Sequence, residues 1–321
     1  MTFVPVVYEH AAALIGRRPF EVSRDAGLLA AAHAVAYARY HHSPVVGGID
    51  VYNVEVEAYG ATLRDAGGSS IPSIEAPFCH CVNDIFALKG LDPLNDGRFP
   101  LVLAAASTLR ATCPGAAIAI PVSGPFSIVQ GLMGMEELLY ATMADPDNAR
   151  EALLVVARHL LHVIEVIASR GFDVILFESS ASPPLLSPVL FRRVEAPALA
   201  LIGQEFRRKK KKGLPMILGG NTLPVLEDIL RAGAGGVICP AEVDGTSFMN
   251  VMERYPEVEV RVNMRPGVFA ASFDEAEREA AKAMDVARGR PNACIGSGVL
   301  PYDAKPEIVL HIHTFIEECL R

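Results

Sequence analysis

Polar side chains capable of acid–base chemistry follow several short β-branched runs, at the points where strands would end. The set is rich in carboxylates and amides, and it contains neither a catalytic triad nor a phosphate-binding loop. Because loops are polar in any protein, we expect about half of these groups to face a common site. The candidates are Glu9, His10, Asp50, Asn53, Glu55, Glu57, Ser123, Glu178, Ser179, Asn221, Thr222, Glu242, Asp244, Asn263, Arg265 and Ser297.

Glu178 is an acid–base candidate from local sequence, because it ends an apolar run and precedes two serines. A carboxylate buried at that position would have a raised pKa and could act as a general acid or base. The same carboxylate could instead accept hydrogen bonds from Ser179 or Ser180 and have a structural role. The sequence leaves both interpretations open.

Cys79, His80 and Cys81 form a thiol–imidazole cluster, with Asp84 nearby. Alternate residues of an extended segment share a side, so the two thiols could face one way and the imidazole the other. A zinc site here would need further ligands from elsewhere, and the spacing differs from the usual Cys-x2-Cys pair. His80 and Cys81 are therefore outside candidates for a metal site. The remaining cysteines predict reduced thiols and no disulfide framework.

Eight short β-branched runs alternate with longer helical segments. They cover residues 4–7, 45–49, 118–122, 174–177, 215–218, 236–239, 258–262 and 293–296. This alternation predicts parallel strands with crossover helices, and eight repeats within one domain length favour a closed (β/α)8 TIM barrel. Residues 51–81 interrupt the rhythm and predict an insertion near the barrel mouth. We expect a single domain over residues 1–321.

The charge and hydrophobic content of the chain argue against nucleic acid and membranes as partners. The chain has 321 residues, is 51% hydrophobic and carries a net charge of −8, so its surface as a whole would repel nucleic acid. The basic run 207–212 is typical of a solvated last helical turn, although it could contact an acidic partner. No apolar stretch is long enough and free enough of charge to predict a membrane span, and residues 1–16 do not resemble a secretory signal. These features predict a cytoplasmic protein.

Several stretches, in this order along the chain, together resemble the uroporphyrinogen decarboxylase superfamily. They read GIDVYNVEVEAYGA (48–61), LDPLNDGRFPLVLAA (91–105), SGPFSIVQGLMGMEELLYATMADPD (123–147), LFESSASPPLLSPVLF (176–191), ILGGNTLPVLEDILRAGAGGV (217–237), VNMRPGVF (262–269) and IGSGVLPYDAKPE (295–307). This superfamily includes tetrapyrrole decarboxylases and methyltransferases that pass methyl groups between corrinoid proteins and thiols. The resemblance implies a (β/α)8 barrel, in agreement with the strand count.

The resemblance is selective at the positions that carry activity. Asp50 is similar to the catalytic aspartate of the decarboxylases, but their substrate-binding Arg-Gln-Ala-Gly-Arg segment is absent, Gly131 stands at their tyrosine and Ser297 at their late histidine. A porphyrinogen carries many carboxylates and needs several cationic partners, so these departures argue against that substrate. The methyltransferases hold zinc with a His-x-Cys pair and a late cysteine. Neither is present here, which makes zinc doubtful.

The segment from Tyr52 to Glu57 resembles the methyltransferase branch more than the decarboxylases. The sequence therefore predicts an enzyme that transfers a methyl group to or from a corrinoid (cobalamin), free or carried on a partner protein, with a small-molecule substrate and possible homodimerisation. Asp50 and Glu178 are the predicted catalytic residues. The predicted substrate-binding residues are Tyr52, Asn53, Glu55, Ser123, Asn221, Asn263 and Ser297. The alternatives are a decarboxylase or lyase of a small or tetrapyrrole carboxylic acid, and a ligand-binding barrel without catalysis.

Overall fold

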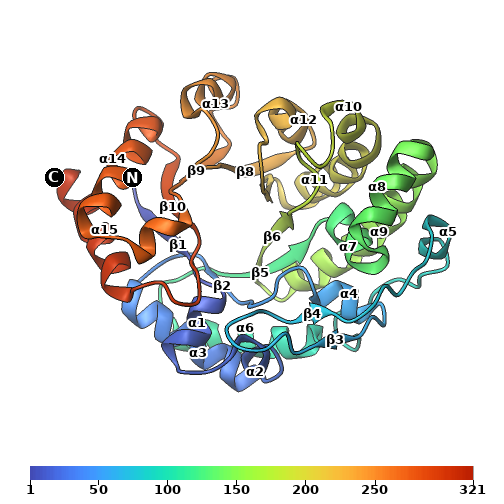
Figure 1. Ribbon diagram of the computed structural model, residues 1–321, viewed down its shortest axis with the longest axis horizontal. Coiled ribbons are helices and arrows are strands. Elements are labelled where there is room, and N and C mark those ends of the chain that lie inside the picture. The colour runs from blue at the N-terminus through green and yellow to red at the C-terminus, as the bar shows by residue number, and fades with distance from the viewer. Residues whose placement is uncertain (321) are drawn as a thin grey trace.

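The eight predicted strands are all present and form one parallel sheet that curls into a nearly closed barrel. A computed structural model describes residues 1–320, and its strand order is β1-β10-β9-β8-β7-β6-β5-β2. Figure 1 shows these strands around a common centre with helices outside them. The barrel strands are Phe3–Val6 (β1), Val45–Val46 (β2), Ile118–Ser123 (β5), Asp173–Glu178 (β6), Leu214–Leu218 (β7), Ala234–Cys239 (β8), Glu259–Asn263 (β9) and Ala293–Val299 (β10).

Helices connect the strands and cover the outside of the barrel. Asp145 accepts a hydrogen bond from the Asn148 backbone at the start of α9, and Ser272 does the same for Glu275 at the start of α14. The helices are α1 (Glu9–Leu14), α2 (Pro19–Ser23), α3 (Ala26–Tyr40), α6 (Phe99–Thr112), α7 (Pro125–Met133), α8 (Met135–Ala144), α9 (Pro146–Ser169), α10 (Pro188–Leu190), the π-helix η1 (Phe191–Glu195), α11 (Ala196–Lys210), α12 (Leu226–Arg231), α13 (Gly245–Met252), α14 (Phe273–Ala287) and α15 (Pro306–Cys319), with 3-10 turns η2 (Leu223–Val225) and η3 (Pro266–Ala270).

Alternation along each strand divides the apolar side chains into two cores. In β6, Val174 and Leu176 pack into the large core between the strands and the helices, whereas Ile175 and Phe177 belong to a separate cluster inside the barrel. This division follows from the two-residue period of a strand, which sends successive side chains to opposite faces. Parity along the strand therefore determines whether a polar residue faces the interior of the barrel or the surrounding helices.

Helix α9 is the one described helix that is long and apolar enough to cross a membrane by length and composition. In the fold it packs against α11, α8, α7 and α5. Its buried residues recur at three- and four-residue intervals, including Leu153, Val156, Leu160 and Ile164. That spacing is typical of an amphipathic helix covering a core, so packing against the barrel accounts for the apolar character of α9.

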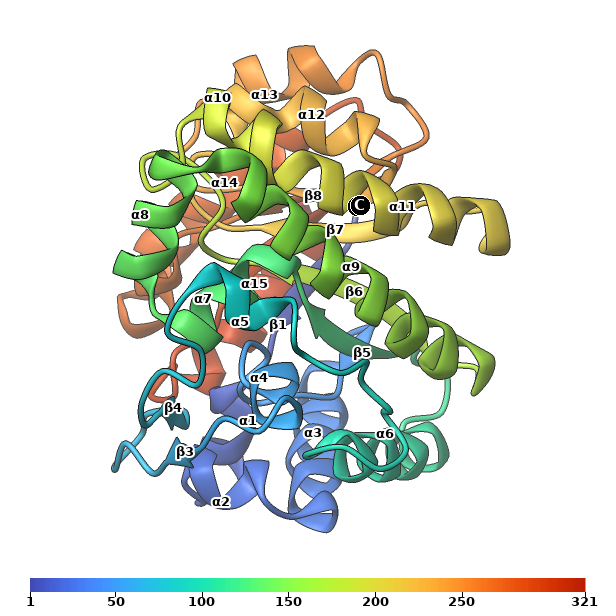
Figure 2. The ribbon, with the colours of Figure 1, turned by 90° about the vertical axis from the view of Figure 1, so that its right-hand side faces the viewer.

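Residues 51–81 connect the end of β2 toward the helices that precede β5. They form α4 (Val54–Ala58) and an antiparallel hairpin of Leu63–Arg64 (β3) and Ser73–Ile74 (β4), followed by α5 (Val82–Ile85). A connection between a strand end and the next helix lies at the carboxyl end of a parallel barrel. Figure 2 shows the hairpin together with α8 and α10 on one side of the molecule.

Candidate functional site

The carboxyl half of the barrel interior is lined mainly by aromatic and aliphatic side chains. We call this region the upper lumen and define it by Tyr8, Val51, Tyr52, Phe177, Ile217, Arg261 and Asn263. Tyr8, Val51 and Phe177 are buried in the interior cluster, and Tyr52 and Ile217 pack against it while remaining partly exposed. The rings of Tyr8 and Phe177 meet edge to face with centroids 6.0 Å apart. The upper lumen is therefore lined mainly by apolar side chains, and few polar groups project into it.

Arg261 and Asn263 bring polar groups into this chamber from β9. They alternate with Val260 and Val262, which are buried in the outer core. Arg261 Nε donates to Asn263 Oδ1 at 3.1 Å. Burial lowers the pKa of Arg261, and within residues 1–320 no carboxylate forms an ion pair with it. Arg261 is thus a guanidinium inside the barrel without a counter-ion.

Glycine on the neighbouring strand makes room for this pair. Gly296 of β10 stands beside Asn263 in the parallel register, as Cys294 stands beside Arg261. A Cβ at Gly296 would collide with Asn263 Oδ1 and would lie 2.7 Å from both Cγ and Cδ of Arg261. The missing side chain lets the arginine stem cross β10 and places the guanidinium toward the carboxyl end of the barrel.

The two tyrosines of the upper lumen have unusual surroundings. Tyr8 is 3% exposed, and its hydroxyl is buried without a hydrogen-bond partner. Burial raises the pKa of Tyr8 and Arg261 lowers it, which places the phenol near the guanidinium. Burial likewise raises the pKa of Tyr52, and the Glu178 charge adds to that increase. Both phenols are therefore neutral donors at physiological pH.

Asp50 lies between the barrel wall and the helices, outside the upper lumen. Its two carboxylate oxygens accept hydrogen bonds from Arg98 at 2.9 and 2.6 Å. Arg98 also bonds Glu57 and donates to the Ser23 carbonyl in α2. Burial alone would lower the pKa of Arg98, but Asp50 and Glu57 raise it above its ordinary value. The predicted catalytic aspartate is therefore one half of a buried bidentate ion pair that joins the end of β2 to α6.

Asn53 extends this cluster to the hairpin. Its amide donates to the Pro72 carbonyl at 2.7 Å and to Asp50 Oδ2 at 3.4 Å. Asn53 is buried, so these bonds account for the burial of its polar group. The structure brings Asp50 and Asn53 together, and their contacts attach the insertion to the barrel.

Glu55 of α4 and Ser123 at the end of β5 form a second buried contact. The Ser123 backbone N–H and hydroxyl donate to the Glu55 carboxylate at 3.0 and 2.6 Å, and the hydroxyl also contacts the Val51 carbonyl. Both residues are 0% exposed. Burial raises the pKa of Glu55 to about 7, against the lowering effect of the Ser123 hydrogen bonds. This carboxyl group faces protein partners rather than an open site.

Glu178 faces the start of α7. Its Oε2 accepts hydrogen bonds from the backbones of Phe126 and Ser127 at 3.1 and 3.2 Å, and the Ser127 hydroxyl bonds Oε1. A Cβ at Gly124 would collide with the Glu178 carboxylate, so the glycine before Pro125 permits this close approach. Burial raises the pKa of Glu178, while Ser127 lowers it. The first turn of α7 therefore holds this carboxylate.

Glu195 is a second buried carboxyl group beside Glu178, contributed by the π-helix η1. It is 0% exposed, and neither of its oxygens has a hydrogen-bond partner that meets normal geometry. Burial and the neighbouring Glu178 charge raise the pKa of Glu195 well above its ordinary value. Two adjacent carboxyl groups removed from water cannot both ionise at low cost, so Glu195 is the protonated member.

The other predicted ligand-binding residues do not converge on the upper lumen. The Ser297 hydroxyl accepts from the Val6 backbone at 2.8 Å and donates to the Gly298 carbonyl, which bridges β10 and β1 where their register shifts. Asn221 is exposed in the loop after β7. Of the predicted set, only Tyr52 and Asn263 line the upper lumen.

His80 and Cys81 lie exposed just before α5. Their backbone N–H groups donate to the Asp84 carboxylate at 2.7 and 3.2 Å, an arrangement that caps the helix. Cys79 is buried next to them. Within residues 1–320, no group of three or more His, Cys, Asp or Glu side chains has metal-binding geometry. The described residues thus do not fit the zinc site of the corrinoid methyltransferases.

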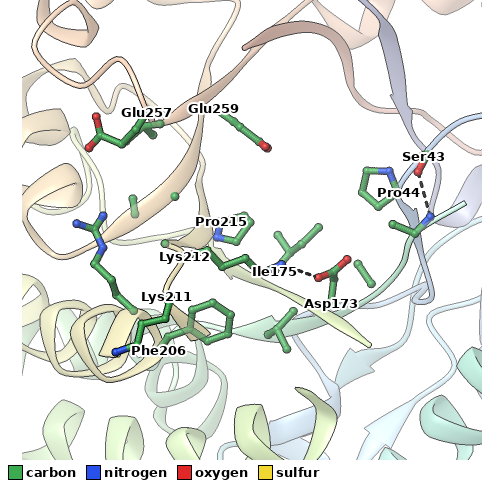
Figure 3. A pocket seen from close by; sticks show the side chains of 18 residues that line it. Ser43, Pro44, Asp173, Ile175, Phe206, Lys211, Lys212, Pro215, Glu257 and Glu259 are labelled. Carbon is green, nitrogen blue, oxygen red and sulfur yellow. Dashed lines mark hydrogen bonds and ion pairs between the residues drawn. The ribbon is translucent and has the colours of Figure 1, made fainter. Parts of the chain in front are cut away.

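A cavity of about 640 Å³ lies at the opposite, amino end of the barrel. Figure 3 shows residues of both charge signs around it, including Asp173, Glu257, Glu259, Lys211 and Lys212. Lys212 forms an ion pair with Asp173 at 3.0 Å. Helix α11 ends at Lys210, so the basic run is its last turn and cap. The cavity contains none of the predicted site residues and lies away from the end where barrel chemistry occurs.

Sequence reasoning missed Arg261, Tyr8 and Glu195. For Arg261 a signal was available, because residues 258–262 alternate Val, Glu, Val, Arg and Val. In a barrel strand that is covered on both faces, the polar members of such an alternation must face the interior. Tyr8 follows β1 with the same parity as Val6, and both lie in the interior cluster. Glu195 carried no comparable signal, since its burial depends on tertiary packing around η1.

The architecture and the location of the polar groups define a (β/α)8-barrel protein whose candidate site lies at the carboxyl end. The family described as uroporphyrinogen decarboxylase (URO-D) matches residues 2–318, and the chain belongs to that family. A methyltransferase from Methanosarcina mazei has the same fold, with a TM-score of 0.84, 20% identity and coverage of 99% of this chain and 94% of that chain.

A putative vitamin-B12 independent methionine synthase from Listeria monocytogenes is a more distant structural relative. Its TM-score is 0.51 at 10% identity, with 97% of each chain covered. No protein of curated function matches this sequence. At these identities the two structures establish a shared fold, and the activity must be argued from the site.

Proposed function

We propose that this chain is a methyltransferase of the URO-D family that passes a methyl group between a small substrate in the upper lumen and a corrinoid, free or carried by a partner protein. The Methanosarcina mazei chain that shares the fold is a methyltransferase, and the proposal extends that activity to this chain. In the proposal, Tyr8, Tyr52, Arg261 and Asn263 contact the substrate, while Phe177 and Ile217 exclude water from it.

One observation carries this proposal: the predicted acid–base carboxylates are bound by protein groups, and the upper lumen presents a cation and neutral donors. Asp50 is held by Arg98, Glu55 by Ser123 and Glu178 by the start of α7. Decarboxylation of a pyrrole side chain or a small acid requires proton delivery to the carbon that loses carbon dioxide. Methyl transfer from an ether, alcohol or amine also needs a proton for the leaving oxygen or nitrogen, and in the proposal a neutral phenol, Tyr8 or Tyr52, supplies it while the apolar walls position the substrate.

Three exposed apolar side chains near the carboxyl end suit contact with a protein that carries the corrinoid. Tyr140 and Met143 of α8 are 67% and 65% exposed, and Val189 of α10 is 70% exposed. Both helices lie in connections that follow strand ends, on the side of the hairpin (Figure 2). When bound, the corrinoid supplies the cobalt chemistry of methyl exchange. The chain's own residues bind and orient the substrate and exclude water.

The experiment is a methyl-transfer assay with the folded chain. Cob(I)alamin is mixed with candidate methyl donors, including methoxylated aromatic acids, methylamines and methanol, and the cobalamin spectrum reports methylation; the reverse reaction starts from methylcobalamin with thiols and phenols. We expect turnover with at least one donor or acceptor and a large loss in Tyr52→Phe or Asn263→Ala. Carbon dioxide release without a corrinoid would replace the proposal with a decarboxylase. Ligand binding without turnover would replace it with a binding barrel.

A further inference from the structure

The upper lumen contains hydrogen-bond donors that have no acceptor within the protein. Among the described residues, the Arg261 side chain forms one hydrogen bond, from Nε to Asn263, and its two terminal nitrogens have no partner. Those nitrogens are not fully sealed from solvent, and Arg261 as a whole is half-buried. Arg261 therefore has two terminal NH2 groups, whose N–H bonds lie in the guanidinium plane, available for an acceptor from outside the protein.

Tyr8 supplies an independent observation at the same place. Its hydroxyl is sealed in the protein and lacks a partner, although a buried hydroxyl normally has one. The phenol lies close enough to Arg261 for the guanidinium to affect its ionisation. The amide of Asn263 is held through its oxygen by Arg261, which orients its Nδ2 donor away from that bond. Three side chains thus offer donors, and none of them offers a free anionic acceptor.

Two other arginines, Arg98 and Arg290, show the hydrogen-bond partners that a structural arginine has in this chain. Arg98 is saturated by Asp50 and Glu57. Arg290 donates to the carbonyls of Met252, Tyr255 and Val258. An arginine inside the barrel with neither carboxylate nor carbonyl partners differs from both. A half-buried guanidinium among apolar walls, with its terminal donors unpaired, suits an anionic partner that arrives from outside.

We propose that Arg261, with Tyr8 and Asn263, binds the carboxylate of a small organic monoacid in the upper lumen. One guanidinium matches one carboxylate through two parallel N–H···O bonds, and the Tyr8 hydroxyl supplies a third donor to the same group. The aromatic and aliphatic walls formed by Phe177, Ile217 and Val51 suit an apolar body attached to that carboxylate. The single cation distinguishes this ligand from inorganic phosphate or a polycarboxylate. This inference names the substrate class of the proposed function and rests on that function for its biological meaning.

Binding can be measured without any corrinoid or turnover. Acetate, isovalerate and benzoate, each paired with its neutral amide, are titrated into the chain by calorimetry, with inorganic phosphate as a competitor. We expect at least one carboxylate to bind about tenfold more tightly than its amide, a preference typical of a charge-assisted fork. Phosphate should not displace it at equal concentration.

Variants assign that preference to the proposed residues. Arg261→Gln should abolish the preference for carboxylate over amide, and Arg261→Lys should retain part of it because the charge remains while the fork is lost. Tyr8→Phe should weaken carboxylate binding several-fold and leave amide binding unchanged. Arg278→Gln removes a charge from an exposed position on α14 and is the matched control, with wild-type binding expected.

The proposal is overturned if carboxylate and amide bind alike, if Arg261→Gln keeps the preference, or if phosphate competes as well as the carboxylate does. If Arg261→Gln does not fold, Arg261→Lys and Tyr8→Phe decide the question, because both keep the volume of the site. Failure of methyl transfer with intact carboxylate binding would remove only the proposed function. Methyl transfer that is indifferent to Arg261 would remove only this inference.

Discussion

Arg98 and Arg261 are two arginines of the same barrel with opposite surroundings. Arg98 lies between the barrel wall and the helices, where Asp50 and Glu57 surround its guanidinium. Arg261 lies inside the barrel, where its side chain bonds Asn263 through one nitrogen and no carboxylate of residues 1–320 pairs with it. The first arginine completes a structural network, and the second has unused donors.

The difference separates residues that hold the barrel together from residues that can hold a ligand. A carboxylate at the end of a strand resembles a catalytic group in sequence. In the structure, however, both oxygens of Asp50 accept hydrogen bonds from Arg98. A residue whose hydrogen-bonding groups are all paired within the protein contributes to stability. A residue with unpaired donors in the upper lumen is available to bind a ligand. The following predictions test that division, from the largest expected effect to the smallest.

Replacing Arg98 should cause the largest loss of stability. Arg98→Met leaves Asp50 buried without its cation, and breaking a buried pair from one side costs about 3–5 kcal/mol. Urea denaturation followed by circular dichroism measures the loss. Arg265→Met is the matched control, because its ion pair with Glu279 leaves the arginine 59% exposed. That control should lose no more than about 1 kcal/mol. Equal losses in the two variants would contradict a structural role for the Arg98 cluster.

Glu55 tests what happens to a buried carboxyl group that has no direct ion pair. Its pKa is about 7 in the folded chain and near 4.5 when unfolded, so the folded state binds the proton more tightly. The free energy of unfolding should therefore fall as pH rises from about 4.5 through 7, by roughly 3 kcal/mol in total. The stabilising contribution is fully present below the lower value and is lost above the higher one.

Glu55→Gln should remove this dependence, because the amide cannot ionise and the Ser123 hydroxyl can still bond it. Measured at pH 5 and pH 8, the stability of Glu55→Gln relative to wild type should improve with pH by roughly the same 3 kcal/mol. Glu318→Gln, at an exposed position of α15, should show no such trend. A Glu55→Gln curve parallel to wild type would mean that the folded chain does not raise this pKa.

Glu178 and Glu195 are a matched pair of buried carboxyl groups, of which Glu178 accepts hydrogen bonds from the start of α7 and Glu195 has only Glu178 beside it. Glu178→Gln replaces a charged acceptor of the N–H groups that begin α7 and should cost about 1.5–3 kcal/mol at pH 7. Glu195→Gln should be nearly neutral, since a protonated carboxyl group and an amide are similar in shape and charge. Denaturation midpoints measure both. A larger loss in Glu195→Gln would reverse the assignment of the proton.

The barrel could be predicted from sequence because each strand must be apolar toward the helices, which leaves a β-branched run wherever a strand occurs. All eight runs became barrel strands, although β2 contracted to Val45–Val46. The site was harder to predict, because the direction of each polar side chain depends on its odd or even position along the strand and on partners far away in the sequence. Asp50 is paired with an arginine 48 positions away, and Ser297 bonds Val6 from the other end of the chain. Neither partner could be recognised from local sequence.

Arg261→Met should change stability in the opposite direction to Arg98→Met. Removing an unpaired, half-buried guanidinium while keeping an apolar stem should raise the free energy of unfolding by about 0.5–1 kcal/mol, because the folded state no longer holds a partly desolvated charge without a counter-ion. Urea denaturation at low carboxylate concentration measures it, with Arg278→Met as the exposed control. Adding a carboxylate that binds wild type should stabilise wild type and leave Arg261→Met unchanged, since ligand stabilisation follows affinity for the folded state. A loss of stability comparable to that of Arg98→Met would instead make Arg261 a second structural arginine, and the contrast between the lumen and the outer cluster would no longer hold.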